Sequence, residues 1–287
     1  MAFIPSSLPP DGGLPGGRAT PGFPAPGIRP AFPRPWRRHR LGAMTDALII
    51  GGGSGMGLAL ARTLLAEHLD VTIAGRSADR LAAARAALEP AAAAPGSAAA
   101  RRIRTLRADI GREEDVAELF DAVGPVEHVV VTAADVTGAY GRSADITAAA
   151  ARSVLDVKLL GAWLVGKYAA GRVTGSLTYT SGINAYRPNG SNTIVAAANG
   201  ALASLASGLT LELAPVRVNV VSPGWVDTPV WDRLGMDKRA AFADLAERLP
   251  ARRIGTPEDI AQAFLSVLRN GFVTGTVLHV DGGHRLV

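Results

Sequence analysis

Glycines are concentrated between Ile50 and Gly57, where the sequence is Ile-Gly-Gly-Gly-Ser-Gly-Met-Gly. A glycine-rich turn lets the backbone approach a pyrophosphate closely, and a helix that begins there offers unpaired N–H groups and the positive end of its dipole. The segment follows a short apolar run and leads into a helical pattern, which is the context that dinucleotide binding requires. We therefore expect this turn to bind the phosphates of a dinucleotide through Gly51, Gly53, Ser54, Gly55, Met56 and Gly57.

The end of the second apolar run distinguishes between two dinucleotides. An acidic residue at this point accepts a hydrogen bond from the ribose 2'-hydroxyl of NAD(H), whereas an arginine pairs with the 2'-phosphate of NADP(H). Here the sequence is Ala74-Gly75-Arg76-Ser77, without an acid. Arg76 therefore favours NADP(H) over NAD(H). The alternative is that Arg76 is only a solvated charge in a loop.

Short apolar runs alternate with longer segments of helical period from Ala47 onward. This alternation predicts an α/β fold of Rossmann type, with a doubly wound parallel sheet of about seven strands between two layers of helices. We expect residues 44–287 to form one domain. The expected strands are 47–50, 71–74, 104–107, 128–132, 176–180, 217–221 and 276–280, and the expected helices are 57–67, 78–88, 113–123, 146–170, 193–213, 236–248 and 257–268.

Residues 1–43 differ in composition from the rest of the chain. They contain ten of the nineteen prolines and six arginines against one acid, so they account for the whole net charge of +5. We expect a disordered extension there, with a polyanion-binding arm at 34–40 as the alternative. The remaining 24 basic and 24 acidic residues cancel, which gives no basis for a nucleic-acid interface.

Other classes of site are disfavoured by residue type. The chain has no cysteine, and its five histidines have no ligand spacing, so we expect no disulfide and no metal site. No segment has the apolar length of a signal peptide or of a membrane span. We therefore expect a cytoplasmic protein that acts on a small molecule without a membrane or nucleic-acid partner.

Several separate segments resemble the short-chain dehydrogenase/reductase family. They are Gly51–Gly57, Ala108-Asp109-Ile110, the run from Arg217 to Gly224, and the run from Val273 to Gly283. The resemblance implies that Asp109 contacts the adenine and that the Pro-Gly segment and Thr228 line the nicotinamide side. It also implies a homotetramer or homodimer built on the helices at 146–170 and 193–213. The cofactor residues that it adds are Asp109, Ile110, Ala133, Pro223, Gly224, Val226 and Thr228.

The catalytic set that the resemblance implies is altered. The family uses an asparagine, a serine, and a tyrosine followed four residues later by a lysine; the tyrosine passes a proton to the substrate carbonyl. Ser181 takes the serine position, but Val195 replaces the tyrosine and Asn199 replaces the lysine. Lys158 stands at the asparagine position. Lysine and asparagine have thus exchanged places, while none of the four tyrosines has a lysine four residues later.

Two residues are candidates for the missing proton donor. Lys158 would have a lowered pKa if buried near a nicotinamide, and could act as an acid or base; the alternative is that it reaches solvent or pairs with Asp156. Tyr186 could point into the pocket from the loop after Ser181; the alternative is a packing or dimer contact. Residues 225–250 correspond to the family's substrate lid, and Trp225 and Trp231 within them suggest a moderately hydrophobic substrate.

The leading hypothesis is an NADP(H)-dependent oxidoreductase acting on a carbonyl or alcohol, with Ser181, Lys158, Tyr186 and Asn199 as candidate catalytic residues. A second hypothesis is a lyase, isomerase or cyclase that keeps the pocket without the proton relay. A third is a cofactor-binding regulator without activity. The fold alone does not separate these hypotheses.

Overall fold

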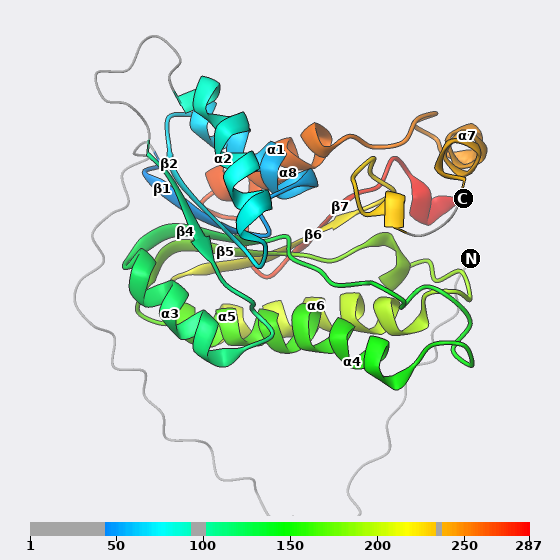
Figure 1. Ribbon diagram of the computed structural model, residues 1–287, viewed down its shortest axis with the longest axis horizontal. Coiled ribbons are helices and arrows are strands. Elements are labelled where there is room, and N and C mark those ends of the chain that lie inside the picture. The colour runs from blue at the N-terminus through cyan, green and yellow to red at the C-terminus, as the bar shows by residue number, and fades with distance from the viewer. Residues whose placement is uncertain (1–43, 93–101, 234–236) are drawn as a thin grey trace, which may run out of the picture. The chain divides into compact units, whose positions relative to one another are not determined.

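A seven-stranded parallel sheet forms the centre of the part of the chain that the computed structural model describes, which comprises residues 44–92, 102–233 and 237–287. The strand order is β3-β2-β1-β4-β5-β6-β7 (Figure 1). This order confirms the predicted doubly wound α/β fold. The strands are β1 (Asp46–Ile50), β2 (Asp70–Gly75), β3 (Ile103–Arg107), β4 (Val126–Val131), β5 (Val173–Thr180), β6 (Arg217–Pro223) and β7 (Val277–Val280).

Helices cover both faces of the sheet. One layer holds α1 (Gly55–Ala66), α2 (Ala78–Ala92) and α8 (Pro257–Arg269), and the opposite layer holds α3 (Glu113–Val123), α4 (Ala148–Leu155), α5 (Gly161–Ala169) and α6 (Thr193–Glu212) (Figure 1). A further helix, α7 (Lys238–Arg248), follows β6.

The apolar runs of the strands are explained by burial on two sides. In β1, Leu48 and Ile50 belong to the core beneath α3, α5 and α6, whereas Ala47 and Ile49 belong to the core beneath α1 and α8. Successive strand residues point to opposite faces, so a strand covered on both faces is apolar at every position. This packing holds the carboxyl ends of the strands rigidly at one edge of the sheet.

The long helix predicted over residues 146–170 is corrected by the structure. Helix α4 begins after Thr147, whose side chain accepts a hydrogen bond from the backbone N–H of Ala150 (3.1 Å). A π-helical turn, η1 (Asp156–Leu160), then separates α4 from α5. The π turn is only five residues long, too short to leave a periodicity of its own, so the sequence pattern did not distinguish it from an α-helix. Such π turns are frequent at functional sites, and this one carries Lys158.

Helix α6 is the one described helix that is long and apolar enough to cross a membrane, and 33% of its apolar segment is buried within the chain. The buried side of α6 packs against β5, β6 and η1, so α6 is one of the helices that cover the sheet. Val195, Asn199, Leu202, Ala206 and Leu209 lie on this buried side. Val195 and Asn199, which the sequence places at two altered catalytic positions, are both buried and both line the cleft.

Some predictions fall outside the described residues. These are the disordered extension at 1–43, the connection at 93–101, and Leu234 and Met236 within the expected lid. The described parts of the lid are the short helix η3 (Trp231–Arg233) and α7.

The start of α8 provides a test of the fold. The Thr256 side chain accepts from the Asp259 N–H (3.2 Å), and the Asp259 carboxylate accepts from the Thr256 N–H (2.8 Å), forming a capping box. We expect Thr256→Ala to lower the free energy of unfolding by about 1 kcal/mol, because a helix N–H loses its partner. Ser266→Ala, at an exposed position of the same helix, should change it by less than about 0.5 kcal/mol. Urea denaturation measures both, and equal effects would contradict this role of the cap.

Candidate active site

A cleft of about 1140 Å³ opens at the carboxyl ends of the strands. β1 and β4 are neighbours in the sheet although β2 and β3 separate them in the sequence, so the winding of the chain reverses there. Ligands of open α/β sheets bind in the crevice at such a reversal. The lining includes every residue that the sequence analysis assigned to a cofactor: Gly51, Gly53, Ser54, Gly55, Met56, Gly57, Arg76, Asp109, Ile110, Ala133, Pro223, Gly224, Val226 and Thr228.

The glycine-rich turn forms a cradle that side chains would fill. Gly51 has φ +98°, and a Cβ on it would lie 2.5 Å from Thr132 Oγ1. A Cβ on Gly57 would lie 2.4 Å from the carbonyl oxygen of Gly51. Ser54 caps α1 with an extended backbone and makes no side-chain hydrogen bond to the first turn of the helix. The turn therefore leaves backbone N–H groups facing the cleft, which suits a pyrophosphate.

Arg76 lies at the end of β2 between two carboxylates. Its guanidinium is 2.9 Å from Asp135 Oδ2 and 4.0 Å from Asp109 Oδ2. Burial raises the pKa of Asp135, but hydrogen bonds from Thr137 and Arg76 outweigh it and hold the pKa below its ordinary value. Half of the Arg76 side chain is exposed, so a 2'-phosphate can reach it.

Arg80 also lines the cleft, four residues after Arg76, and it was not among the residues expected from the sequence. It lies in the first turn of α2, where its backbone N–H donates to Ser77 Oγ (3.3 Å). The available signal was a second arginine shortly after the end of β2, where a 2'-phosphate is expected.

The opposite end of the cleft is closed by the segment after β6. A Cβ on Gly224 would lie 2.8 Å from the Asp281 Cα, so only glycine allows this segment to approach the end of β7. A Cβ on Gly55 would lie 3.3 Å from Thr228 Cγ2. The glycine-rich turn and the segment after β6 thus meet across the cleft, which suits a cofactor that extends from one to the other.

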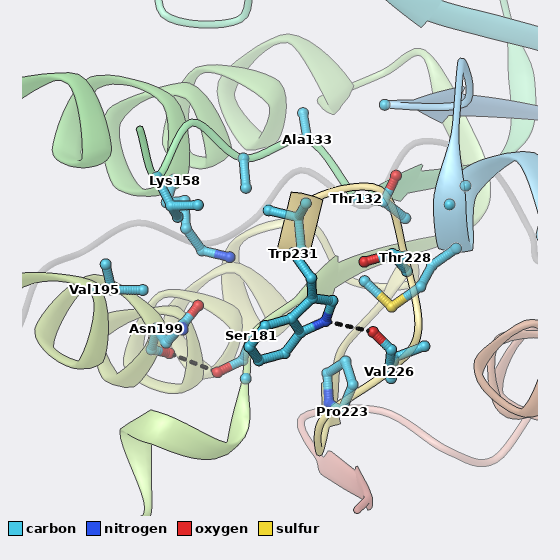
Figure 2. A pocket seen from close by; sticks show the side chains of 18 of the residues that line it. Thr132, Ala133, Lys158, Ser181, Val195, Asn199, Pro223, Val226, Thr228 and Trp231 are labelled. Atoms are coloured by element: carbon cyan, nitrogen blue, oxygen red, sulfur yellow. Dashed lines mark hydrogen bonds between the residues drawn. The ribbon is translucent and has the colours of Figure 1, made fainter. Parts of the chain in front are cut away.

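Ser181, Asn199 and Lys158 lie together in this cleft (Figure 2). Ser181 Oγ donates to the backbone carbonyl of Asn199 (2.9 Å), and Asn199 Nδ2 donates to Asn184 Oδ1 (2.6 Å). Val195, at the family's tyrosine position, is buried among Ala139 and Ala198. The structure therefore brings together the three residues expected to have replaced or retained the catalytic set.

The ammonium of Lys158 points into the cleft and is 7% exposed (Figure 2). Nζ donates to the backbone carbonyl of Thr180 (3.2 Å), and no ion pair with Asp156 or another carboxylate is present in the described part of the chain. Burial lowers the pKa of Lys158 from 10.5 to about 8. Both alternatives from the sequence, a lysine that reaches solvent and a pair with Asp156, therefore disagree with this geometry.

One buried acceptor in the cluster is unsatisfied by protein. Within residues 44–92, 102–233 and 237–287, Asn199 Oδ1 has no hydrogen-bond partner, although Asn199 is buried. A buried polar atom without a partner is destabilising, and a ligand hydroxyl would satisfy it. The position is where the resemblance places the residue that holds the nicotinamide ribose. The lining residues thus fit a dinucleotide at both of its ends.

The expectation for Tyr186 is corrected by the structure. Tyr186 is absent from the residues that line the cleft, its side chain is 41% exposed, and its ring packs edge-on against His279 with centroids 4.4 Å apart. The sequence placed Tyr186 in the correct loop, after the short helix η2 (Ile183–Ala185), but could not determine the direction of its side chain.

Aromatic side chains form one wall of the cleft. The rings of Trp225 and Trp231 lie 4.4 Å apart, and Trp231 Nε1 donates to the carbonyl of Val226 (2.7 Å; Figure 2). Lys238 pairs with Asp227 (2.6 Å) and Asp232 (3.4 Å), which ties α7 to the segment that carries both tryptophans. This arrangement agrees with the apolar lid expected from the sequence.

The fold and the cleft define a dinucleotide-binding enzyme domain, and comparison with known proteins identifies its family. Residues 51–285 match the family model described as enoyl-(acyl carrier protein) reductase. The short-chain dehydrogenase/reductase ucsE of an Acremonium species is 31% identical over 250 residues, covering 82% of this chain and 93% of that protein. The chain belongs to the short-chain dehydrogenase/reductase family, a family of oxidoreductases.

Two solved structures show the same fold. The MalC reductase/Diels-Alderase of Malbranchea aurantiaca matches with a TM-score of 0.78 and 30% identity, covering 86% of this chain and 98% of that one. A small-chain dehydrogenase in complex with NADPH matches with a TM-score of 0.69 and 30% identity, covering 85% of this chain and all of that one.

The titration of Lys158 is directly measurable, because the chain has only three lysines. We expect the Lys158 side-chain signal of ¹³C-lysine-labelled protein to titrate near pH 8. Hydrogen bonds that Lys167 donates to Glu113 and Lys238 donates to Asp227 raise the pKa of both lysines above the ordinary value, so these two side chains should stay protonated near pH 8. Lys158→Met assigns the signal by removing it. Three signals that titrate together would contradict the burial of this ammonium.

Proposed function

We propose that the protein is an NADP(H)-dependent oxidoreductase that reduces a carbonyl group, or oxidises the corresponding alcohol, in a small and moderately hydrophobic substrate. The observation that carries this proposal is the buried Lys158 ammonium, which points into the same cleft as the glycine-rich turn. An acid with a pKa near neutrality beside a dinucleotide site is what carbonyl reduction requires.

The choice of NADP(H) over NAD(H) is supported at the end of β2. Arg76 and Arg80 line the cleft there, and the acid that would accept from a 2'-hydroxyl is missing. A 2'-phosphate would compete with Asp135 for the Arg76 guanidinium and gain the charge of Arg80. A related dehydrogenase has been solved with NADPH, which agrees with this choice.

The mechanism assigns the proton to Lys158. A reduced cofactor held by the glycine-rich turn and the segment after β6 would supply the hydride for the carbonyl carbon. Lys158 Nζ gives its proton to the carbonyl oxygen, becomes a neutral amine, and regains a proton from solvent. Burial favours the neutral amine over the ammonium, so the environment that lowers the pKa also assists the proton transfer.

Ser181 and Asn199 position the reacting groups in this proposal. The Ser181 hydroxyl, now donating to the Asn199 carbonyl, can rotate to donate to the substrate oxygen. Asn199 Oδ1, which lacks a protein partner in the described part of the chain, accepts from a ribose hydroxyl of the cofactor. Val195 leaves apolar space where the family's tyrosine would stand.

A second candidate function is a cyclase or another non-redox enzyme on the same scaffold. It is favoured by the resemblance to a protein described as both reductase and Diels-Alderase, and by the apolar walls at Val195 and Trp231. Such an enzyme would convert substrate without net consumption of reduced cofactor. Monitoring substrate loss together with the absorbance of the reduced nicotinamide separates the two functions.

We also propose a homodimer or homotetramer built on α5 and α6, in the cytoplasm. Trp163 of α5 is 45% exposed and Leu211 of α6 is 82% exposed, which leaves apolar surface on both helices. Exposed apolar surface of this kind is typical of subunit interfaces.

Replacing Lys158 tests the proposed mechanism. With NADPH and a panel of aromatic aldehydes, we expect Lys158→Met to lower kcat by about 10²- to 10⁴-fold, the usual contribution of a positioned acid. The Kd for NADPH should change much less. The control is Lys167→Met, which removes an exposed lysine paired with Glu113 and should keep full turnover. Unchanged turnover in Lys158→Met would exclude Lys158 as the proton donor.

Replacing the arginines at the end of β2 tests the choice of cofactor. We expect Arg76→Leu and Arg80→Leu each to raise the Kd for NADPH by about tenfold, the scale of one charge-assisted hydrogen bond, with little effect on NADH. Arg85→Gln is the control, because Arg85 lies on the same helix α2 and pairs with Glu89. Tighter binding of NADH than of NADPH by the wild-type protein would overturn the assignment.

A further inference from the structure

Positive charge is concentrated in the cleft. The described residues that line it include the five cationic side chains of Arg76, Arg80, Lys158, Arg187 and Arg248, together with His284, but only one carboxylate, that of Asp109. Residues 44–287 as a whole carry equal numbers of basic and acidic side chains. The excess of basic over acidic side chains is therefore local to the cleft, where low-dielectric walls strengthen the electrostatic field on a bound anion.

The strand order divides these cations into two groups. Arg76 and Arg80 follow β2, on the side of the sheet where the glycine-rich turn follows β1. Arg187, Arg248 and His284 follow β5, β6 and β7, and β4 separates the ends of these strands from β1. In the proposed function the cofactor phosphates occupy the first group, so the second group faces a different anion.

Arg187 is the free cation of this second group. Its backbone N–H donates to the carbonyl of Ile183 (2.8 Å), which fixes its base at the end of η2. Its side chain makes no ion pair within the described ranges, whereas Arg248 pairs with Asp244 (2.6 Å). An exposed guanidinium at the mouth of a cleft can present two parallel donors to a planar anion.

His284 connects the two arginines. Burial lowers its pKa, the nearby charges of Arg187 and Arg248 lower it further, and Asp281 opposes them. His284 Nδ1 is buried and has no hydrogen-bond partner among the residues that the structure describes. In the tautomer that carries its proton on Nδ1, the neutral imidazole can donate an N–H to an anion bound by the two arginines.

The aromatic wall lies beside this group. The ring of Trp225 is 6.3 Å from that of His284, in an edge-on arrangement, and 4.4 Å from that of Trp231. Trp225 and Trp231 line the same cleft as Lys158 and Arg187. The cleft thus presents a proton donor, an apolar wall and a cationic mouth to one ligand.

We propose that Arg187, His284 and Arg248 form an oxyanion-binding subsite, and that the substrate is a carbonyl compound or alcohol with a carboxylate or phosphate at the far end of an apolar, aromatic body. The position of the reacting carbonyl rests on the proposed function. The binding of the anion does not, because it requires neither hydride transfer nor a proton from Lys158.

Calorimetry on the full-length protein saturated with NADP⁺ tests the subsite without turnover. The probes are 2-naphthoate, 2-naphthyl phosphate and the neutral 2-naphthamide, which share one aromatic body. We expect at least one anion to bind about tenfold more tightly than the amide, the scale of a charge-assisted pair. The tighter anion identifies the group. Arg187→Gln should abolish the difference, and Arg239→Gln, an exposed arginine of α7 outside the cleft lining, should preserve it.

The possible results are decisive in both directions. Selective binding of an anion that is lost in Arg187→Gln supports the subsite, even if no carbonyl compound is reduced, in which case only the proposed function fails. Equal binding of all three probes, absence of binding at millimolar concentration, or selectivity that survives in Arg187→Gln overturns it.

Discussion

The burial of one ammonium group organises the active site. Lys158 holds a charge inside the cleft with the backbone carbonyl of Thr180 as its hydrogen-bond partner, and its pKa falls from 10.5 to about 8. Because the pKa is lowered on folding, the charged form opposes folding by about 3 kcal/mol below pH 8, and this penalty disappears as the pH rises toward 10.5. Because burying this ammonium destabilises the fold, a functional role is the direct explanation for the presence of Lys158 in the cleft.

The substitutions at the family's catalytic positions form one coordinated set. In the family, the lysine one helical turn after the tyrosine lowers the pKa of that tyrosine. With Val195 at the tyrosine position, a lysine at position 199 would have no tyrosine to act on. Lys158 enters the same cleft from the π turn, on a different helix from Val195. Asn199 retains polar atoms toward the cofactor, with one acceptor unsatisfied by the described protein. In the proposed function, Lys158 takes the place of the tyrosine as the acid of this cleft.

The sequence predicted the fold well because every central strand is buried on both faces, which produces unambiguous apolar runs. The residues that it assigned to a cofactor all line one cleft, because glycines and Arg76 act locally, through backbone conformation and position at a strand end. It did not predict the π turn, which is too short to leave a periodicity of its own. It placed Tyr186 in the correct loop but did not determine the direction of its side chain, and it did not place Arg187 and His284 in the same cleft. Both outcomes depend on the direction of loop side chains and on segments almost a hundred residues apart.

The pH dependence of kcat/KM for carbonyl reduction, in the wild type and in Lys158→Met, tests the central claim most directly. If the Lys158 ammonium donates the proton, the wild-type value falls as the pH rises through about 8, because the acid form is lost. The small residual activity of Lys158→Met should lack this step. A wild-type profile that is flat through pH 8, or a step that persists in Lys158→Met, would contradict the account.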